Sequence, residues 1–195
     1  MKILSGKYKG KSLKTISTSS IRPTCGLVKE AVFNICAPYI EKAKFLDLFA
    51  GVGAVGLEAL SRGASSVTFV DASPYAIRLI RENCQCVDPE LPVTIMKQEV
   101  STAIQKLTKN GKVFDLIYID PPYDLSNQYI ASILRAIFEG HLLAEDGWLF
   151  LENASTQPIL IYGLTLKRRR KLGGTFLSEY FLNNPTESSP EEFSI

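Results

Sequence analysis

Short apolar runs alternate with helical segments along the middle of this chain, and this alternation most limits the folds it can adopt. Runs rich in Val, Ile, Leu and Phe are typical of strands, and a segment with helical spacing follows each of the first four. Such alternation predicts a doubly wound, mostly parallel sheet. The expected strands are 45–49, 66–70, 91–96, 113–119 and 148–152, and the expected helices between them are 54–62, 74–86, 100–109 and 126–139.

The two ends of the chain depart from this pattern. Residues 3–16 indicate a short hairpin turning near Gly10, and a helix is expected to start at 22–24 with Thr24 as its N-cap. Near the other end, two strand-like runs flank Gly173-Gly174, which predicts an antiparallel hairpin at the sheet edge. We therefore divide the chain into a basic N-terminal hairpin extension, a main domain and a tail expected to be disordered, at 1–20, 21–182 and 183–195.

Composition excludes several classes of protein. The chain has 195 residues and 46% hydrophobic content, enough for a full core. No apolar run reaches the roughly 18 residues of a membrane span, and no signal peptide is evident. With one histidine, His141, a zinc site or a Ser-His-Asp triad is hard to assemble, and the cysteines lack metal-ligand spacing: Cys25, Cys36, Cys84 and Cys86. We expect a cytoplasmic monomer with reduced thiols, no metal and no membrane partner.

Positive charge gathers in two places, although the net charge is only +2. Residues 1–30 hold seven Lys or Arg against one Glu, and 167–171 reads KRRRK. Two basic patches on an otherwise acidic chain indicate a polyanion at one face, unless they are only solvated charge. Alternation along a strand separates Arg169 from its two neighbours. The N-terminal lysines should share one face and make most of the phosphate contacts: Lys7, Lys9 and Lys11.

A glycine-rich turn follows the first strand of the main domain. Within DLFAGVGAVG (47–56), Gly51, Gly53 and Gly56 fit G-x-G-x-x-G, and Asp71 ends the next strand. This pattern fits a dinucleotide site, in which the glycines admit a pyrophosphate and the acid holds a ribose hydroxyl. It also fits a turn that serves only close packing of helix on strand. The pattern alone leaves these open.

Asp47 favours S-adenosylmethionine over a dinucleotide. This acid lies inside the strand just before the turn, where its charge opposes a pyrophosphate but suits an ammonium group. S-adenosylmethionine carries an ammonium and a sulfonium and has no phosphate. Asp71 suits either ligand, since both contain an adenosine ribose.

The motif Asp120-Pro121-Pro122-Tyr123 follows the apolar run 113–119. Prolines cannot continue a central strand, so the acid and the Tyr lie on a stiff loop at its carboxyl end. A carboxylate accepting one N–H of a purine amine, with the Pro121 carbonyl accepting the other, would direct the nitrogen lone pair at a methyl sulfonium. Tyr123 offers a flat face for an extruded base. The motif therefore predicts methyl transfer to an exocyclic amine.

These motifs together resemble the RsmD-type bacterial 16S ribosomal RNA guanine-N2 methyltransferases. The resemblance runs through residues 3–6, RPT (22–24), VKEAVFNI (28–35), FLDLFAGVGAVGLEALSRGA (45–64), IDPPY (119–123) and GTFLSEY (174–180). It implies a Rossmann-like class I methyltransferase fold with a mostly parallel seven-stranded sheet and an antiparallel C-terminal hairpin. It also implies S-adenosylmethionine as cofactor, S-adenosylhomocysteine as product, and 16S rRNA or the assembling small ribosomal subunit as partner.

Site residues carry over from the resemblance by position. The catalytic loop would be Asp120, Pro121 and Tyr123, and the cofactor site would hold Asp47, Phe49, Gly51, Gly53, Asp71 and Glu99. Glu99 stands where the family often has Asp, and Val52 replaces a common Ser. Arg22 and Thr24 would either contact RNA or cofactor or cap a helix.

Three other functions remain open at this point. A DNA adenine-N6 or cytosine-N4 methyltransferase shares the D-P-P-Y chemistry, but 195 residues leave little room for a target-recognition domain. An NAD-dependent oxidoreductase would need a hydride-transfer site, which the sequence does not offer. An RNA-binding module without catalysis is disfavoured by the intact D-P-P-Y.

Overall fold

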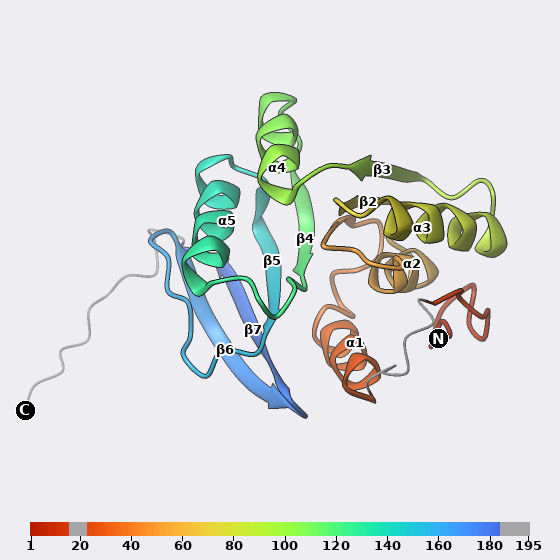
Figure 1. The fold of residues 1–195 in the computed structure, drawn as a ribbon, viewed down its shortest axis with the longest axis horizontal. Coiled ribbons are helices and arrows are strands. Elements are labelled where there is room, and N and C mark those ends of the chain that lie inside the picture. The colour runs from red at the N-terminus through yellow and green to blue at the C-terminus, as the bar shows by residue number, and fades with distance from the viewer. Residues whose placement is uncertain (16–22, 184–195) are drawn as a thin grey trace, which may run out of the picture.

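A single seven-stranded sheet organises the chain in a computed structural model that describes residues 1–15 and 23–183 (Figure 1). The strand order is β3-β2-β1-β4-β5-β7-β6. The neighbours from β3 to β5 pair in parallel, whereas β7 pairs antiparallel with β5 and β6. The strands are β1 Lys44–Leu48, β2 Ser66–Asp71, β3 Val93–Lys97, β4 Phe114–Ile119, β5 Leu143–Asn153, β6 Leu164–Leu172 and β7 Thr175–Leu182.

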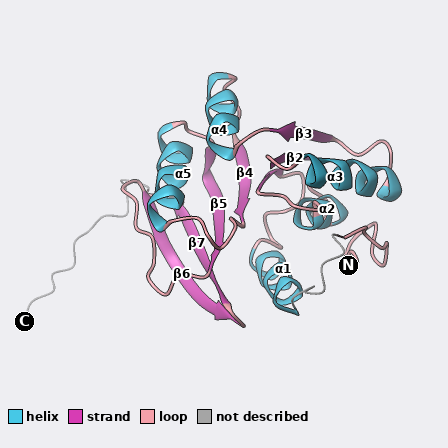
Figure 2. Ribbon diagram, viewed as in Figure 1, coloured by secondary structure: helices cyan, strands magenta, loops and turns pink. Residues whose placement is uncertain are grey.

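Helices cover both faces of the sheet, as Figure 2 shows. Alternate strand residues point to opposite faces. Phe45 therefore packs in the apolar cluster with the first three helices, while Leu46 packs in the cluster with the last two. The helices are α1 Pro23–Ile35, α2 Ala54–Ser61, α3 Pro74–Val87, α4 Val100–Lys109 and α5 Asn127–Glu139.

This architecture confirms the predicted α/β fold with a mostly parallel sheet and an antiparallel C-terminal hairpin. Among the strands of the sheet, the one whose bounds differ most from the prediction is β5, which begins at Leu143 rather than at residue 148. Its first residues pair with β4 through a register shift between Phe114 and Leu116, and Glu145 and Asp146 are exposed there. A prediction from apolar runs misses this part of the strand, because it contains polar residues and pairs irregularly with β4. No helix among the described residues is long and apolar enough to cross a membrane.

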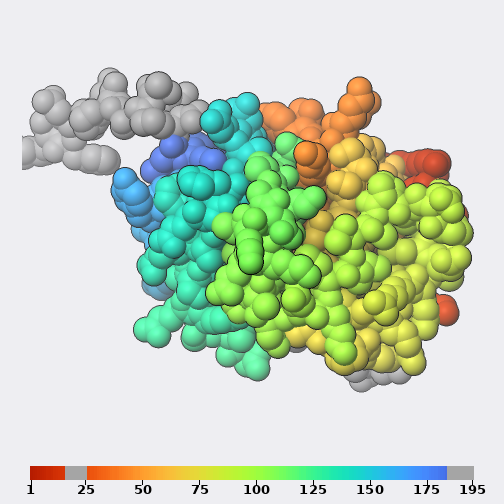
Figure 3. Space-filling view, turned by 90° about the horizontal axis from the view of Figure 1, so that it is seen from above, coloured from red at the N-terminus to blue at the C-terminus, as the bar shows by residue number. Residues whose placement is uncertain are grey.

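The N-terminal segment is hairpin-like, as expected, but it contains no extended pair of strands. The described part of the segment forms one antiparallel bridge, between Lys2 and Ser12, and turns in between. Gly6 has φ 82°, and a Cβ on it would lie 1.7 Å from the Ser61 carbonyl oxygen. The segment therefore folds tightly onto α2, and in Figure 3 it lies at the margin of the molecule beside α3. Lys7 and Lys9 lie in the turn, so the expected strand alternation does not apply to them.

Two further expectations concern the ends of the described ranges. Helix α1 begins at Pro23, so Thr24 is its second residue and not its N-cap. Arg22 lies outside the described residues. The predicted tail begins at Asn183, whose backbone N–H still bonds the Gly163 carbonyl (3.1 Å), and the rest of the tail (184–195) is not described.

Candidate active site

A pocket of about 690 Å³ opens where the strand order reverses, at the carboxyl ends of β1, β2 and β4. Ligands of doubly wound sheets bind at this position. The turn after β1 contributes Phe49 and Gly51 to its lining, and Asp71 comes from the end of β2. The rest of the wall consists of Ala72, Ser73, Glu99, the D-P-P-Y loop, Leu125 and Tyr129. We call this the switch-point pocket.

The turn after β1 is built from backbone in the left-handed region. Phe49 has φ 59°, Gly51 φ 56° and Gly53 φ 78°. A Cβ on Gly51 would meet nothing within 4 Å, so its backbone faces open space in the pocket. Gly56 differs, because a Cβ there would lie 2.3 Å from Phe69 Cε1. The glycines therefore have separate tasks: Gly51 exposes backbone to a ligand, and Gly56 lets α2 approach β2.

Asp47 lies behind this turn and is not among the residues lining the pocket. Its side chain is 2% exposed, and Oδ2 accepts the Gly56 N–H at 2.9 Å. The N-cap of α2 is Gly53, which has no side chain to cap the helix, so Asp47 supplies the acceptor from β1. Burial raises the pKa of Asp47 well above its usual range, and the charges of Asp120 and Asp71 add to this. Its contact with a ligand ammonium stays a prediction.

Asp71 joins two loops of the pocket. Its Oδ2 accepts the Gly51 N–H at 2.9 Å, and its Oδ1 accepts the Ser73 N–H at 2.8 Å. A carboxylate oxygen can accept a second hydrogen bond, so Asp71 can also receive ribose hydroxyls. Glu99 occupies the N-cap position of α4 without a capping hydrogen bond from its side chain, and it also lines the pocket.

The D-P-P-Y loop brings the predicted catalytic residues to the same pocket. The Asp120 N–H bonds the Leu48 carbonyl at 3.4 Å, which ties the loop to the end of β1. Pro121 is buried, whereas Asp120 is exposed and Tyr123 is 52% exposed. Below the loop, the Tyr118 hydroxyl donates to Glu152 Oε2 at 2.6 Å and links β4 to β5. Burial raises the pKa of Tyr118 well above its usual range, so this hydroxyl stays a donor.

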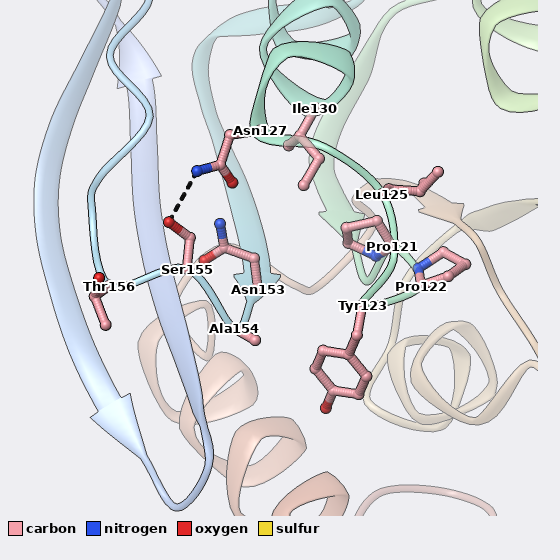
Figure 4. A pocket seen from close by; sticks show the side chains of 10 residues that line it. All are labelled: Pro121, Pro122, Tyr123, Leu125, Asn127, Ile130, Asn153, Ala154, Ser155 and Thr156. Carbon is pink, nitrogen blue, oxygen red and sulfur yellow. Dashed lines mark hydrogen bonds between the residues drawn. The ribbon is translucent and has the colours of Figure 1, made fainter.

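A second pocket of about 500 Å³ lies on the other side of the same loop (Figure 4). It shares Pro121, Pro122, Tyr123 and Leu125 with the switch-point pocket. Its far wall is formed by Asn127, Ile130 and residues 153–156, which begin at the last residue of β5. We call it the β5 pocket. The D-P-P-Y loop is therefore a common wall between two cavities, as a loop that serves two substrates would be.

Comparisons with known proteins agree with this geometry. The family model named Conserved hypothetical protein 95 matches residues 1–181. The chain belongs to that family. It is 34% identical to YlbH of Bacillus subtilis, which is named as an rRNA methyltransferase, over 92% of this chain and 98% of that protein. It is 30% identical to ribosomal RNA small subunit methyltransferase D of Haemophilus influenzae, over 82% of each chain.

A solved structure with the same fold is that of yhhF from Escherichia coli, which is named as a methyltransferase. The TM-score is 0.80 at 25% sequence identity, over 93% of this chain and 97% of that chain. The resemblance to the RsmD-type family is thus confirmed.

In the present chain, the N-terminal lysines predicted to bind RNA lie away from both pockets. Lys7 lies 3.8 Å from Asp88, and the Lys11 ammonium donates to the Val87 carbonyl. Both contacts are at the carboxyl end of α3, whereas Ser73 at its other end lines the switch-point pocket. A 14-residue helix is about 21 Å long. The site residues that the structure assembles are thus those of the sheet loops, and the lysines form a separate surface.

The sequence did not single out the far wall of the β5 pocket. Asn153 ends β5, Ser155 and Thr156 come shortly after it, and β5 pairs with β4. Polar residues at the carboxyl end of a strand beside β4 were the feature of the sequence that could have predicted this wall. Arg169 belongs here too, because its guanidinium donates to the carbonyls of Ser155 and Thr156. Within the described residues, no group of three or more His, Cys, Asp or Glu side chains could hold a metal ion.

Proposed function

We propose that this chain is an S-adenosylmethionine-dependent N-methyltransferase that methylates the exocyclic amine of a guanine in 16S rRNA. The observation that carries this proposal is the position of the D-P-P-Y loop, which lines both the switch-point pocket and the β5 pocket. A methyl donor and a methyl acceptor must come into direct contact, and the two pockets adjoin each other at this loop. The names of the relatives in Bacillus subtilis and Haemophilus influenzae support rRNA as the substrate.

The lining of the switch-point pocket fits this cofactor better than a dinucleotide. It contains three acids, Asp71, Glu99 and Asp120, and among the described residues no Lys or Arg lines it. An acidic pocket favours a ligand with a sulfonium and an ammonium and disfavours a pyrophosphate. Asp71 would hold the ribose, while Phe49, Leu125 and Tyr129 offer apolar surface for the adenine. The cofactor supplies a methyl group on a positively charged sulfur.

The chain's own residues then prepare the acceptor. The Asp120 carboxylate would accept one N–H of the guanine amine and the Pro121 carbonyl the other, so that the nitrogen lone pair faces the methyl group. The amine nitrogen would take the methyl group as the donor sulfur leaves, and the amine would then lose a proton to solvent. Positive charge develops on this nitrogen, and the two acceptors stabilise it. Tyr123 would stack on the extruded base.

Methylation of purified small ribosomal subunits tests the proposal. Subunits from cells lacking the protein should accept tritiated methyl groups from S-adenosylmethionine, and nucleoside digestion should give N2-methylguanosine. Assay of free 16S rRNA alongside would show which form is the substrate. Methylated adenine or cytosine in DNA, with none in rRNA, would favour the DNA methyltransferase instead. We expect the protein to act in the cytoplasm as a monomer.

A further inference from the structure

The amide of Asn153 is a buried polar group in the wall of the β5 pocket. Asn153 is the last residue of β5 and is 6% exposed. Its Oδ1 is shielded and has no hydrogen-bond partner among the residues that the structure describes. Buried polar atoms are normally paired, and an unpaired one needs an explanation. Figure 4 shows this side chain beside Ser155, across the pocket from Pro121 and Tyr123.

A positive charge lies on the other side of Asn153, toward the C-terminal hairpin. Asn153 pairs with Phe176 of β7, and side chains paired across antiparallel strands share a face. The guanidinium of Arg169 lies 4.0 Å from the centre of the Phe176 ring. A cation attracts a carbonyl oxygen and repels an amide N–H2. The favoured orientation of the Asn153 side-chain amide therefore has Oδ1 toward the hairpin, where this atom is shielded. Its N–H2 group then faces the pocket.

We propose that Asn153 determines base specificity by donating a hydrogen bond to O6 of the guanine, an inference that rests on the proposed function. The amine and O6 of guanine lie at opposite ends of one edge of the base. Asp120 lines the switch-point pocket, so a base whose amine lies at Asp120 would extend past Pro121 and Tyr123 into the β5 pocket, with O6 toward its far wall. A base with an amine at C6 would place N–H2 against N–H2 and leave both without an acceptor.

The other side chains of the β5 pocket leave this task to Asn153. The Asn127 amide already donates to Ser155 Oγ at 3.0 Å. Pro121, Pro122 and Ile130 offer apolar surface, and Tyr123 offers a ring for stacking. Arg169 holds Ser155 and Thr156 by their carbonyls and so fixes the wall next to Asn153. Asn153 is therefore the buried side-chain amide of this wall, beside Asn127 and Ser155, whose side chains bond each other.

Base analogues at the methylated position test the proposal. The nucleotide is first located by digestion and mass spectrometry. Ligated RNA then carries guanine, 2-aminopurine or 2,6-diaminopurine at that position and is assembled into subunits. All three bases have the reacting amine at C2, but 2-aminopurine lacks O6 and 2,6-diaminopurine has an amine in its place. For the wild type, kcat/KM should be about 10- to 100-fold higher with guanine than with 2,6-diaminopurine.

Variants separate the role of Asn153 from the intrinsic reactivity of the bases. Asn153→Ala should reduce the preference for guanine by about tenfold, and Asn153→Asp, which only accepts, should favour 2,6-diaminopurine. Asn110→Ala at the end of α4 is the control and should keep the wild-type preference. Equal use of guanine and 2,6-diaminopurine by the wild type would overturn the role of Asn153, even if the variants did not fold. Failure of the wild type to methylate guanine would overturn the proposed function itself.

Discussion

The carboxylate of Asp71 bonds the backbone N–H of Gly51 at 2.9 Å, so the end of β2 fixes the glycine turn after β1. Asp71→Ala should remove this bond, the bond to Ser73 and the acceptor for a ribose. Affinity for S-adenosylhomocysteine should fall by about 10- to 100-fold, since each bond involves a charged group. Calorimetry measures this, with Glu90→Ala as a control outside both pockets. Unchanged affinity in Asp71→Ala, or saturable NADH binding by the wild type, would contradict the assignment of the pocket.

Asp120 should matter more for turnover than for binding. Asp120→Ala removes an acceptor that is needed mainly as charge develops on the amine nitrogen, so kcat should fall by about 10²–10³-fold. Affinity for the ribosomal subunit should change little. Single-turnover methylation and filter binding measure the two quantities separately. A variant that methylates subunits at the wild-type rate would show that the loop acts without this carboxylate.

Substitution of Gly56 should destabilise the fold through contact with β2. A Cβ at this position would lie 2.3 Å from Phe69 Cε1 and 2.7 Å from Val67 Cγ1. Gly56→Ala should therefore lower the free energy of unfolding by about 1–3 kcal/mol. The matched control is Gly174→Ala in the turn between β6 and β7, where a Cβ would meet nothing within 4 Å. Denaturant unfolding of both variants checks this, and equal stabilities would be inconsistent with the close helix–strand packing.

The buried carboxyl of Asp47 should make stability depend on pH. Its pKa is raised in the folded protein, so the folded state binds more protons than the unfolded state above the usual value of 3.8. This group therefore lowers the free energy of unfolding as pH rises from that value toward the raised pKa. Asp47→Asn keeps an acceptor for the Gly56 N–H without the charge. Relative to the wild type, this variant should gain stability as pH rises above 3.8 toward the raised pKa, and a difference that is constant with pH would refute the effect.

The N-terminal lysines should contribute to RNA binding through charge alone. Replacing Lys7, Lys9 and Lys11 with Ala should weaken binding and reduce the slope of log affinity against log salt, by up to roughly 0.7–0.9 per lost phosphate contact. Cofactor affinity should not change, because these lysines do not line the switch-point pocket. Replacement of Lys106, Lys109 and Lys112, around the end of α4, gives a matched loss of charge. Equal slopes for the two triple variants would indicate no preference for the N-terminal surface.

The sheet could be predicted because its signals are local. The apolar runs that became β1, β2 and β4 are bounded by turns or prolines, and α4 spans the predicted residues 100–109. The N-terminal segment could not be predicted in the same way. Its shape depends on Glu58, which lies more than fifty positions away and accepts the N–H groups of Leu4 and Ser5. Nothing in residues 1–15 alone specifies that partner.

Some of the site residues could also be predicted from the sequence. Gly51, Asp71 and Asp120 each end or follow a strand, and the rule for doubly wound sheets brings such residues together. The role of Asp47 was harder to predict. Alternation places it in the sheet but does not tell whether its carboxylate accepts a hydrogen bond from the Gly56 N–H or from a ligand. Asn153 and Arg169 come from separate elements that meet only through the order of β5, β7 and β6.

Because one loop closes both pockets, occupation of either side has consequences for the other. A ligand that orders Asp120 and Tyr123 for its own pocket also shapes the wall of its neighbour. Thermodynamic linkage then requires that cofactor and RNA alter each other's affinity by the same factor. Release of the spent cofactor and release of the modified RNA would accordingly be coupled steps, because Pro121, Pro122 and Tyr123 line both pockets.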